Sequence, residues 1–248
     1  MNDELLIDLH KGNARQGPGG DEQTKLALNL AGLSNASQPL QAADIGCGTG
    51  HSTLVLAEQL NATITAVDLF SDFLDVLTAD AEKRGLADKI TTLACSMNDL
   101  PLKEGSLDVI WTEGAIYNMG FEKGITYFKR FLKPGGILAA SEITWLTQIR
   151  PREITNHWKA EYPEIATAAQ KIQIFEEQEF MLKGYFPLPQ SCWIENYYIP
   201  LENSFDTFLA KHDSGEAQAI IDAKKTEIAL YKAYRDYYSY GFYITQKI

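Results

Sequence analysis

The sequence predicts an α/β fold built around a largely parallel sheet. Short runs rich in β-branched residues alternate with amphipathic segments of about 10 to 15 residues, which is the order that strand-helix-strand units produce. Such units pair their strands in parallel through right-handed crossovers. Glycine or acidic residues follow several of the predicted strands, at the edge where ligands bind in these sheets.

The first part of the chain supplies most of the predicted elements. Helices are expected at residues 21–33, 51–60 and 71–85, where Ser71 is a good N-cap and Gly85 a good C-terminal stop. Strands are expected at residues 42–45, 61–67, 90–93, 107–111 and 137–140. A helix at 121–132 and a turn at 133–136 precede the last of these strands.

Residues 145–183 break this rhythm. They hold aromatic residues and prolines without a strand, followed by a helix-like run over 164–183, and they predict a helical insertion that caps the active site. A strand at 193–199, a mostly helical segment at 205–238 and a final strand at 241–245 complete the prediction. One domain is expected over 1–248, with residues 1–25, including the glycine-rich loop at 10–20, as a lid over the ligand.

Composition and charge disfavour several functional classes. The chain has 248 residues, of which 45% are hydrophobic and 22% charged, and no apolar run approaches the roughly 18 residues that a membrane span needs. Its net charge of -11 repels phosphate backbones, which disfavours nucleic acid as a partner. No basic and apolar leader opens the chain, so a cytoplasmic location is expected. Three scattered cysteines indicate neither a disulfide framework nor a metal site.

A glycine-rich loop is the strongest local signal. Three alternating glycines follow the first predicted strand and precede a helix, at Gly46, Gly48 and Gly50. Glycine reaches positive φ and has no Cβ, so this backbone can turn sharply and lie against a ligand. Asp68 closes the next strand, where its carboxylate can accept hydrogen bonds from both ribose hydroxyls. A dinucleotide fingerprint needs a further glycine where this chain has His51, although a dinucleotide site and a plain turn remain alternatives.

The motif Asp44-x-Gly46-x-Gly48-x-Gly50 resembles the first motif of class I S-adenosylmethionine (SAM) methyltransferases. The similarity extends over most of the chain, best from Asp44 to Glu142, and looks closest to small-molecule enzymes such as those of ubiquinone and menaquinone biosynthesis. The resemblance implies a Rossmann-like three-layer sandwich with a seven-stranded, mostly parallel sheet whose last strand is antiparallel. It also implies SAM as cofactor, S-adenosylhomocysteine as product, and in-line SN2 methyl transfer catalysed mainly by positioning and desolvation.

The resemblance also implies which residues bind the cofactor. Gly46, Cys47 and Gly48 would line the methionine portion, and Asp68 would take the ribose. Leu69 and Phe70 would lie against the adenine, with Ser96 in place of the usual acidic residue and the Met97 amide beside it. Asp44, Gly50, Glu113 and Gly114 complete the set near the loop. Arg15 and Gln16 are expected to close over SAM from the lid.

The segment from Trp111 to Asn118 is expected to border both cofactor and acceptor. It lacks the Asn/Asp-Pro-Pro-aromatic motif of enzymes that methylate amino groups of nucleic acid and protein, and no cysteine follows a proline, so a small-molecule acceptor is favoured. The candidate catalytic residues are Glu113, Tyr117 and His157, each with a competing packing or surface role. A NAD-dependent oxidoreductase and a SAM-binding protein without transferase activity are the alternative functions. Tyrosines of the last third suggest a possible homodimer interface, at Tyr231, Tyr234, Tyr237, Tyr238 and Tyr240.

Overall fold

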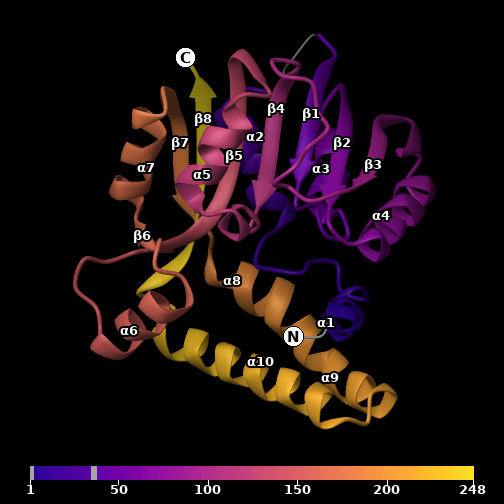
Figure 1. Ribbon diagram of the computed structural model, residues 1–248, viewed down its shortest axis with the longest axis vertical. Helices are drawn as coiled ribbons and strands as arrows, with labels where there is room; N and C mark the ends of the chain where they lie inside the picture. The colour runs from indigo at the N-terminus through magenta and orange to yellow at the C-terminus, as the bar shows by residue number, and fades with distance from the viewer. Residues whose placement is uncertain (1–2, 35–37) are drawn as a thin grey trace.

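One sheet organises the computed structural model, which describes residues 3–34 and 38–248 (Figure 1). Across the sheet the strands are β3 (Ile90–Ala94), β2 (Ala62–Asp68), β1 (Leu40–Ile45), β4 (Leu107–Glu113), β5 (Leu132–Trp145), β8 (Tyr238–Lys247) and β7 (Phe180–Pro187). Strands β1 to β5 pair in parallel, whereas β8 runs antiparallel to both β5 and β7. The short strand β6 (Ala166–Thr167) pairs with the end of β5. The predicted mostly parallel sheet with an antiparallel last strand is confirmed.

Helices cover both faces of this sheet. The helices α2 (Asp21–Ala31), α3 (His51–Gln59) and α4 (Ser71–Lys83) lie on one face, and α5 (Phe121–Lys129) and α7 (Ala168–Glu177) on the other. Two short 3-10 turns, η1 (Ala87–Lys89) and η2 (Ile116–Asn118), follow α4 and β4. Alternating strand residues fill the two interfaces: Ile137 and Ala139 of β5 face α2, while Leu138 and Ala140 face α5.

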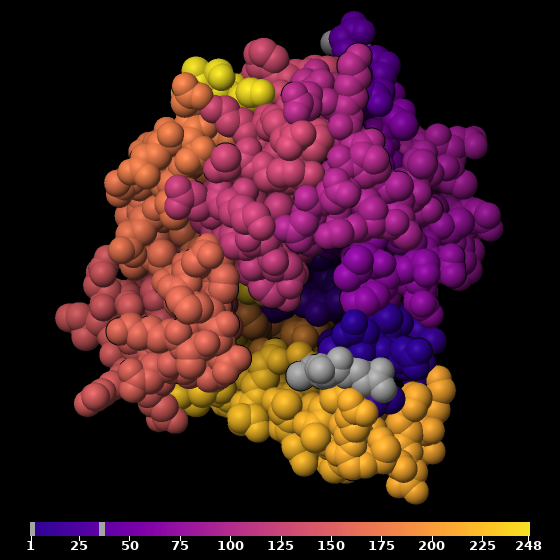
Figure 2. All heavy atoms as spheres, in the orientation of Figure 1, coloured from indigo at the N-terminus to yellow at the C-terminus, as the bar shows by residue number. Residues whose placement is uncertain are grey.

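A layer of helices, the helical cap, lies beneath the sheet in Figure 1, facing the carboxyl ends of the parallel strands. It consists of α1 (Asp3–His10), α6 (Arg152–Glu161), α8 (Gln190–Trp193), the π-helical turn η3 (Ile194–Tyr198), α9 (Ile199–Lys211) and α10 (Gly215–Tyr234). The Asp8 carboxylate accepts hydrogen bonds from Lys211 and His212, which ties α1 to the end of α9. Figure 2 shows a hollow between the cap and the body.

Aromatic side chains make up much of the interior of the cap. Trp193 and Tyr231 stack with their ring centroids 4.4 Å apart, and the Trp193 indole donates a hydrogen bond to Ser239. Tyr231 and Tyr238 are buried in this cluster. They therefore stabilise the chain itself and are not available for the homodimer interface that the sequence suggested.

The largest corrections concern the origin of the cap. The predicted strand at 193–199 is wrong, because this segment is helical: Trp193, Tyr197 and Tyr198 are buried at helical spacing, whereas the residues between them are partly or fully exposed. The helix expected over 164–183 ends at Glu177, and Glu179 turns the chain into β7 with a φ of +58°. The predicted insertion at 145–183 therefore contributes only α6 to the cap, and α7 flanks the sheet.

The predicted lid at 1–25 also has more regular structure than expected. Residues 1–2 lie outside the described residues, residues 3–10 form α1, and only residues 11–20 are an irregular loop. The turn expected at 133–136 lies within β5, and the preceding helix ends at Lys129. No helix among residues 3–34 and 38–248 is both long and apolar enough to traverse a bilayer.

Candidate active site

The glycine-rich loop joins β1 to α3 at the carboxyl edge of the sheet. All three alternating glycines have positive φ, with values of +74° at Gly46, +56° at Gly48 and +80° at Gly50. The Gly46 and Cys47 amides donate hydrogen bonds to the Val67 carbonyl at 2.8 and 3.0 Å, which fixes the loop against β2. A Cβ at Gly46 would lie 2.3 Å from the Ala115 methyl group, so only glycine fits there. The Cys47 thiol is buried, and burial raises its pKa, as expected for a packing residue.

Asp68 stands at the end of β2 beside this loop. One carboxylate oxygen accepts a hydrogen bond of 2.8 Å from the Gly48 amide, and the other accepts one of 3.0 Å from the Phe70 amide. Burial raises the pKa of Asp68, while these two backbone hydrogen bonds oppose the rise. Each oxygen has a further lone pair, so the carboxylate can still accept hydrogen bonds from a ligand.

Gln16 brings the N-terminal loop onto the glycine-rich loop. Its side-chain oxygen accepts a hydrogen bond of 2.9 Å from the Thr49 amide, and its nitrogen donates to the Asn13 carbonyl at 3.0 Å. A Cβ at Gly48 would lie only 2.2 Å from that oxygen. Gln16 therefore covers Gly48 directly, in the place expected for a lid residue.

Arg15 and Glu113 form a nearly buried ion pair between the N-terminal loop and the end of β4. The Arg15 guanidinium donates to Glu113 at 2.9 Å, while its Nη2 atom has only a looser ion pair of 3.5 Å with Asp21. Glu113 also accepts hydrogen bonds from the Thr24 hydroxyl at 2.7 Å and the Trp111 indole at 2.9 Å. With three donors bound to it, Glu113 is suited to holding the lid in place rather than to accepting a proton.

Asp44 is buried at the end of β1. One of its oxygens accepts hydrogen bonds from the Ser52 and Thr53 hydroxyls of α3, at 2.9 and 2.7 Å. The other oxygen has no partner among the described residues. Burial raises the pKa of Asp44 to about 7, with the Thr53 hydrogen bond acting in the opposite direction. Asp44 thus anchors α3 to β1 beneath the loop and leaves one oxygen unused.

The four residues expected around an adenine lie on neighbouring loops. Leu69 follows Asp68 with its side chain 61% exposed, and Phe70 packs edge-on against Phe73 of α4. Met97 follows β3, and its terminal methyl would contact a Cβ placed on Gly46. Ser96 accepts a hydrogen bond from the Asn98 amide, which shapes this turn. An exposed leucine at this edge is the type of apolar surface that an adenine ring can cover.

The predicted catalytic residues do not all come together. Tyr117, in η2, is 44% exposed and meets Tyr162 edge-on at 6.2 Å. Gly114 lies two residues before η2. Its amide donates a hydrogen bond to the Ser141 hydroxyl, and its Cα faces the Tyr240 ring. His157 lies on α6 and contacts Trp158. Among the residues that the structure describes, no contact joins His157 to Tyr117 or to the glycine-rich loop.

Nothing in the sequence indicated that a buried polar cluster lies behind Tyr117. It consists of Glu142 on β5, Tyr162 after α6 and Lys171 on α7. Glu142 is acidic and follows the strand predicted at 137–140, so it gave no sign that this strand continues. Lys171 has the pattern of an ordinary surface residue of a helix. Thr24 and Trp111, which bind Glu113, also carried no motif.

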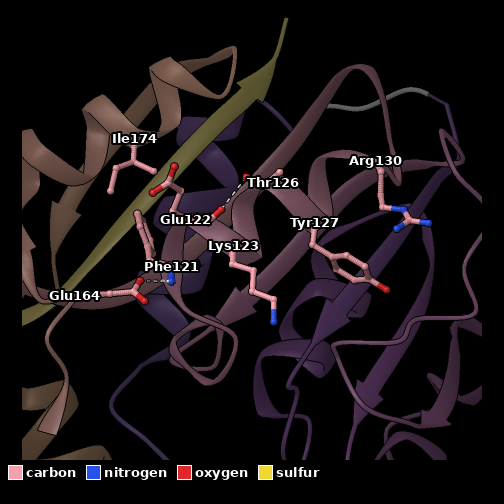
Figure 3. A pocket seen from close by; sticks show the side chains of 8 residues that line it. All are labelled: Phe121, Glu122, Lys123, Thr126, Tyr127, Arg130, Glu164 and Ile174. Carbon is pink, nitrogen blue, oxygen red and sulfur yellow. Dashed lines mark hydrogen bonds between the residues drawn. The ribbon is translucent and has the colours of Figure 1, made fainter.

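An open pocket of about 850 Å³ lies on the outer side of α5 (Figure 3). Its walls include Tyr127 of α5, Arg130 just after that helix, and Glu164, whose carboxylate accepts a hydrogen bond of 2.6 Å from the Phe121 amide at the start of α5. None of the predicted site residues lines it. This pocket is therefore separate from the glycine-rich loop.

Comparison with known proteins gives a consistent classification. Residues 43–140 match the family model described as methyltransferase domain. Within curated proteins, the chain is 37% identical over 103 residues to a ribosomal protein arginine N-methyltransferase of Schizosaccharomyces pombe, a match that covers 40% of this chain and 19% of that protein. It is 28% identical over 161 residues to a sterol 24-C-methyltransferase of Pneumocystis carinii, covering 64% of this chain and 42% of that protein. The chain thus spans less than half the length of these two relatives.

A solved structure extends the likeness to nearly the whole fold. The SAM-dependent methyltransferase from Geobacter sulfurreducens, crystallised in complex with S-adenosylhomocysteine, superposes with a TM-score of 0.84 at 18% identity, over 99% of this chain and 98% of that one. Residues 43–140 thus match a methyltransferase domain, and the overall fold is the one found in a SAM-dependent methyltransferase. The closer likeness to ubiquinone and menaquinone enzymes stays a prediction.

Proposed function

We propose that this chain, which carries a methyltransferase domain within the fold of SAM-dependent methyltransferases, transfers a methyl group from SAM to a small-molecule acceptor. The observation that carries the proposal is the bare glycine-rich loop between Asp44 and Gly50, with the Asp68 carboxylate held beside it by the Gly48 amide. Loop and carboxylate together suit a nucleoside that carries no phosphate.

The residues around the loop fit each part of SAM. Gly46, Cys47 and Gly48 present backbone to the methionine portion, where any side chain at Gly46 would collide with Ala115. The Asp68 carboxylate would accept hydrogen bonds from the ribose hydroxyls. The adenine would lie on the exposed Leu69, with Phe70, Ser96 and Met97 around it.

The N-terminal loop would cover the methionine end. Gln16 already lies over Gly48, and the Nη2 atom of Arg15 has no hydrogen-bond partner among the described residues. Its only partner among them is Asp21, in an ion pair of 3.5 Å, and the neighbouring Gln16 contacts the glycine-rich loop, so Arg15 can bind a ligand carboxylate at this place. Glu113 would hold Arg15 in this place from the end of β4.

Catalysis would come mainly from positioning. SAM supplies an activated methyl group that is transferred by in-line displacement, so the protein has to orient the acceptor and exclude water. The proximity obtained in this way can supply about 7 to 11 kcal/mol of the barrier. The cap closes the hollow from below (Figure 2), and the half-exposed Tyr117 lies in η2, just after β4. We assign no proton-accepting role to Glu113, because three donors already bind it. We assign none to His157, because it lies on α6 and no contact among the described residues joins it to Tyr117 or to the glycine-rich loop.

The two alternative functions are less well supported. In place of the glycine that a dinucleotide site needs, His51 has its Nε2 atom 2.7 Å from an Asp21 oxygen and joins α3 to α2. A SAM-binding protein without transferase activity would use the same loop. The hollow between the cap and the sheet favours an enzyme, because a methyltransferase needs space for an acceptor beside the cofactor. A protein that only binds SAM needs no such space.

Two measurements test the proposal. Isothermal titration with SAM, S-adenosylhomocysteine and NAD should show binding of the first two, and binding of NAD alone would refute the assignment. A screen of small alcohols, phenols, amines, thiols and carboxylates, read out as release of S-adenosylhomocysteine, should then identify acceptors. Tight SAM binding with no turnover on any class would favour the binding protein. A cytoplasmic location stays a prediction.

A further inference from the structure

Three buried polar groups near Tyr117 lack the partners that such groups normally have. Glu142 is 1% exposed, and neither of its carboxylate oxygens has a hydrogen-bond partner among the described residues. The same holds for the Tyr162 hydroxyl. Lys171 is fully buried, and the one hydrogen bond found for its ammonium is a long one of 3.3 Å to the Glu164 carbonyl. Buried polar groups are satisfied in nearly all proteins, so this cluster requires an explanation.

The cluster lies next to the proposed reaction site. Glu142 follows Ser141, which pairs with Glu113 at the end of β4. By strand alternation its side chain faces the same side as Leu138 and Ala140, toward α5. On that side the Lys171 ammonium lies 3.9 Å from the centroid of the Phe121 ring.

Tyr162 connects the cluster to Tyr117. Its ring meets that of the half-exposed Tyr117 edge-on, and its hydroxyl is near enough to Glu142 for each group to affect the pKa of the other, although no hydrogen bond of good geometry joins them. A group that entered past Tyr117 would therefore meet Tyr162 before it reached the two charged side chains.

The charges of the cluster attract each other without touching. Burial raises the pKa of Glu142 and lowers that of Lys171, and in each case the opposite charge acts against the shift. No ion pair within 4 Å joins them among the described residues. Buried opposite charges offset their desolvation best in direct contact, so a polar group that bridged Glu142 and Lys171 would stabilise both charges.

We propose that Glu142, Lys171 and Tyr162 form the polar end of the acceptor pocket and bind a hydroxyl group of the acceptor. A hydroxyl group donates one hydrogen bond and accepts two, so it would donate to Glu142 and accept from Lys171 and Tyr162. Lys171 would repel an ammonium group and Glu142 a carboxylate or phosphate, which selects against acceptors with a charge at this end. This inference rests on the proposed function, because it assigns one end of the same pocket.

On the cap side of Tyr117, the charge of Lys224 is already neutralised, which agrees with an uncharged acceptor. Lys224 of α10 affects the pKa of Tyr117, but its ammonium forms an ion pair of 2.8 Å with Glu227. Glu227 also accepts a hydrogen bond from the Tyr198 hydroxyl at 3.2 Å. Lys224 therefore has a carboxylate partner within the cap and does not need one from the acceptor.

The test uses matched pairs of probes on the full chain saturated with S-adenosylhomocysteine. Each pair is a small alcohol or phenol and its methyl ether, with the corresponding carboxylate and trimethylammonium compounds as charged members. We expect at least one hydroxyl compound to bind tenfold or more tightly than its ether and its charged analogues. In the double variant Glu142→Gln/Lys171→Met this preference should vanish, while the Kd for SAM stays within twofold of the wild-type value.

A matched control is Lys159→Met/Glu161→Gln, which makes the same changes at two exposed positions of α6 and should keep the preference. If the double variant does not fold, Tyr162→Phe removes only a hydroxyl and should lower the preference at least threefold. A wild-type protein with no hydroxyl preference, or variants that keep it, would show that the cluster holds only a structural water, and the inference would be overturned. Failure of the wild-type protein to bind SAM would instead refute the proposed function.

Discussion

Replacing Gly48 by alanine tests whether the N-terminal loop is packed on the glycine-rich loop as described. Gly48 has a φ of +56°, and a left-handed backbone costs an alanine about 1 to 2 kcal/mol. The new Cβ would also lie 2.2 Å from the Gln16 side-chain oxygen. Gln16 must then move and give up its hydrogen bond from the Thr49 amide, a loss of about 1 kcal/mol. We expect Gly48→Ala to lower the free energy of unfolding by about 2 to 3 kcal/mol.

Gly85→Ala is the matched control for backbone strain. Gly85 has a similar φ of +68°, but a Cβ there would meet nothing within 4 Å. Strain and the unfolded-state entropy change are common to both variants, so the difference between them isolates the displacement of Gln16. In a Gln16→Ala background the two glycine substitutions should cost the same.

Urea denaturation and calorimetric titration with SAM are the assays. Gly48→Ala should be less stable than Gly85→Ala by about 1 kcal/mol and should bind SAM at least tenfold more weakly than the wild-type protein. Gly85→Ala should bind SAM normally. Equal stabilities of the two variants, together with unchanged SAM affinity, would refute both the packing of Gln16 and the placement of the cofactor.

Three further predictions concern the carboxylates of the site. Asp68→Ala should weaken SAM binding by about 1.5 to 3 kcal/mol, the range for hydrogen bonds to a charged group; an unaltered Kd by calorimetry would remove Asp68 from the site. In a double-mutant cycle, Arg15→Met and Glu113→Gln should each destabilise the protein, with a coupling energy of about 1 kcal/mol or more in the unfolding free energy, and additive effects would show that the ion pair does not fasten the lid. Burial holds the pKa of Asp44 at about 7 against 3.8 for the free side chain, so between these values the native state keeps a proton that the unfolded chain releases. The stability of the wild-type protein relative to Asp44→Asn should therefore fall as pH rises from 5 to 8, and parallel pH profiles of the two proteins would contradict this.

The sequence predicted the parts of the fold that depend on local patterns. Strands β1 to β4 are short apolar runs bounded by turn residues, and the glycine-rich loop needs positive φ wherever it occurs. The loop and Asp68 could therefore be placed from spacing, whereas the residues after β3 and β4 were assigned from the resemblance to class I SAM methyltransferases. A lid that includes Gln16 was predicted from the glycine content of residues 10–20. The helix α1 in front of Gln16 was not predicted.

The cap could not be predicted in the same way, because its helices are defined by packing between distant segments. The run 193–199 has many aromatic and β-branched residues, which favour strands, but burial of Trp193 and Tyr197 against α10 and β8 makes it helical. Strand β5 was expected to stop at residue 140, but it continues to Trp145. Glu142 is buried inside the continuing strand, and its neighbours Tyr162 and Lys171 come from segments whose meeting only the tertiary structure reveals.

The link between Asp8 and the end of α9 has a consequence for how ligands enter and leave. Residues 11–20 are a strap fastened on both sides, by α1 on the cap and by the Arg15 ion pair on the sheet. Under the proposed function, a nucleoside bound on the glycine-rich loop would leave when one of these fastenings opens. Its dwell time would then depend on a carboxylate in the first helix.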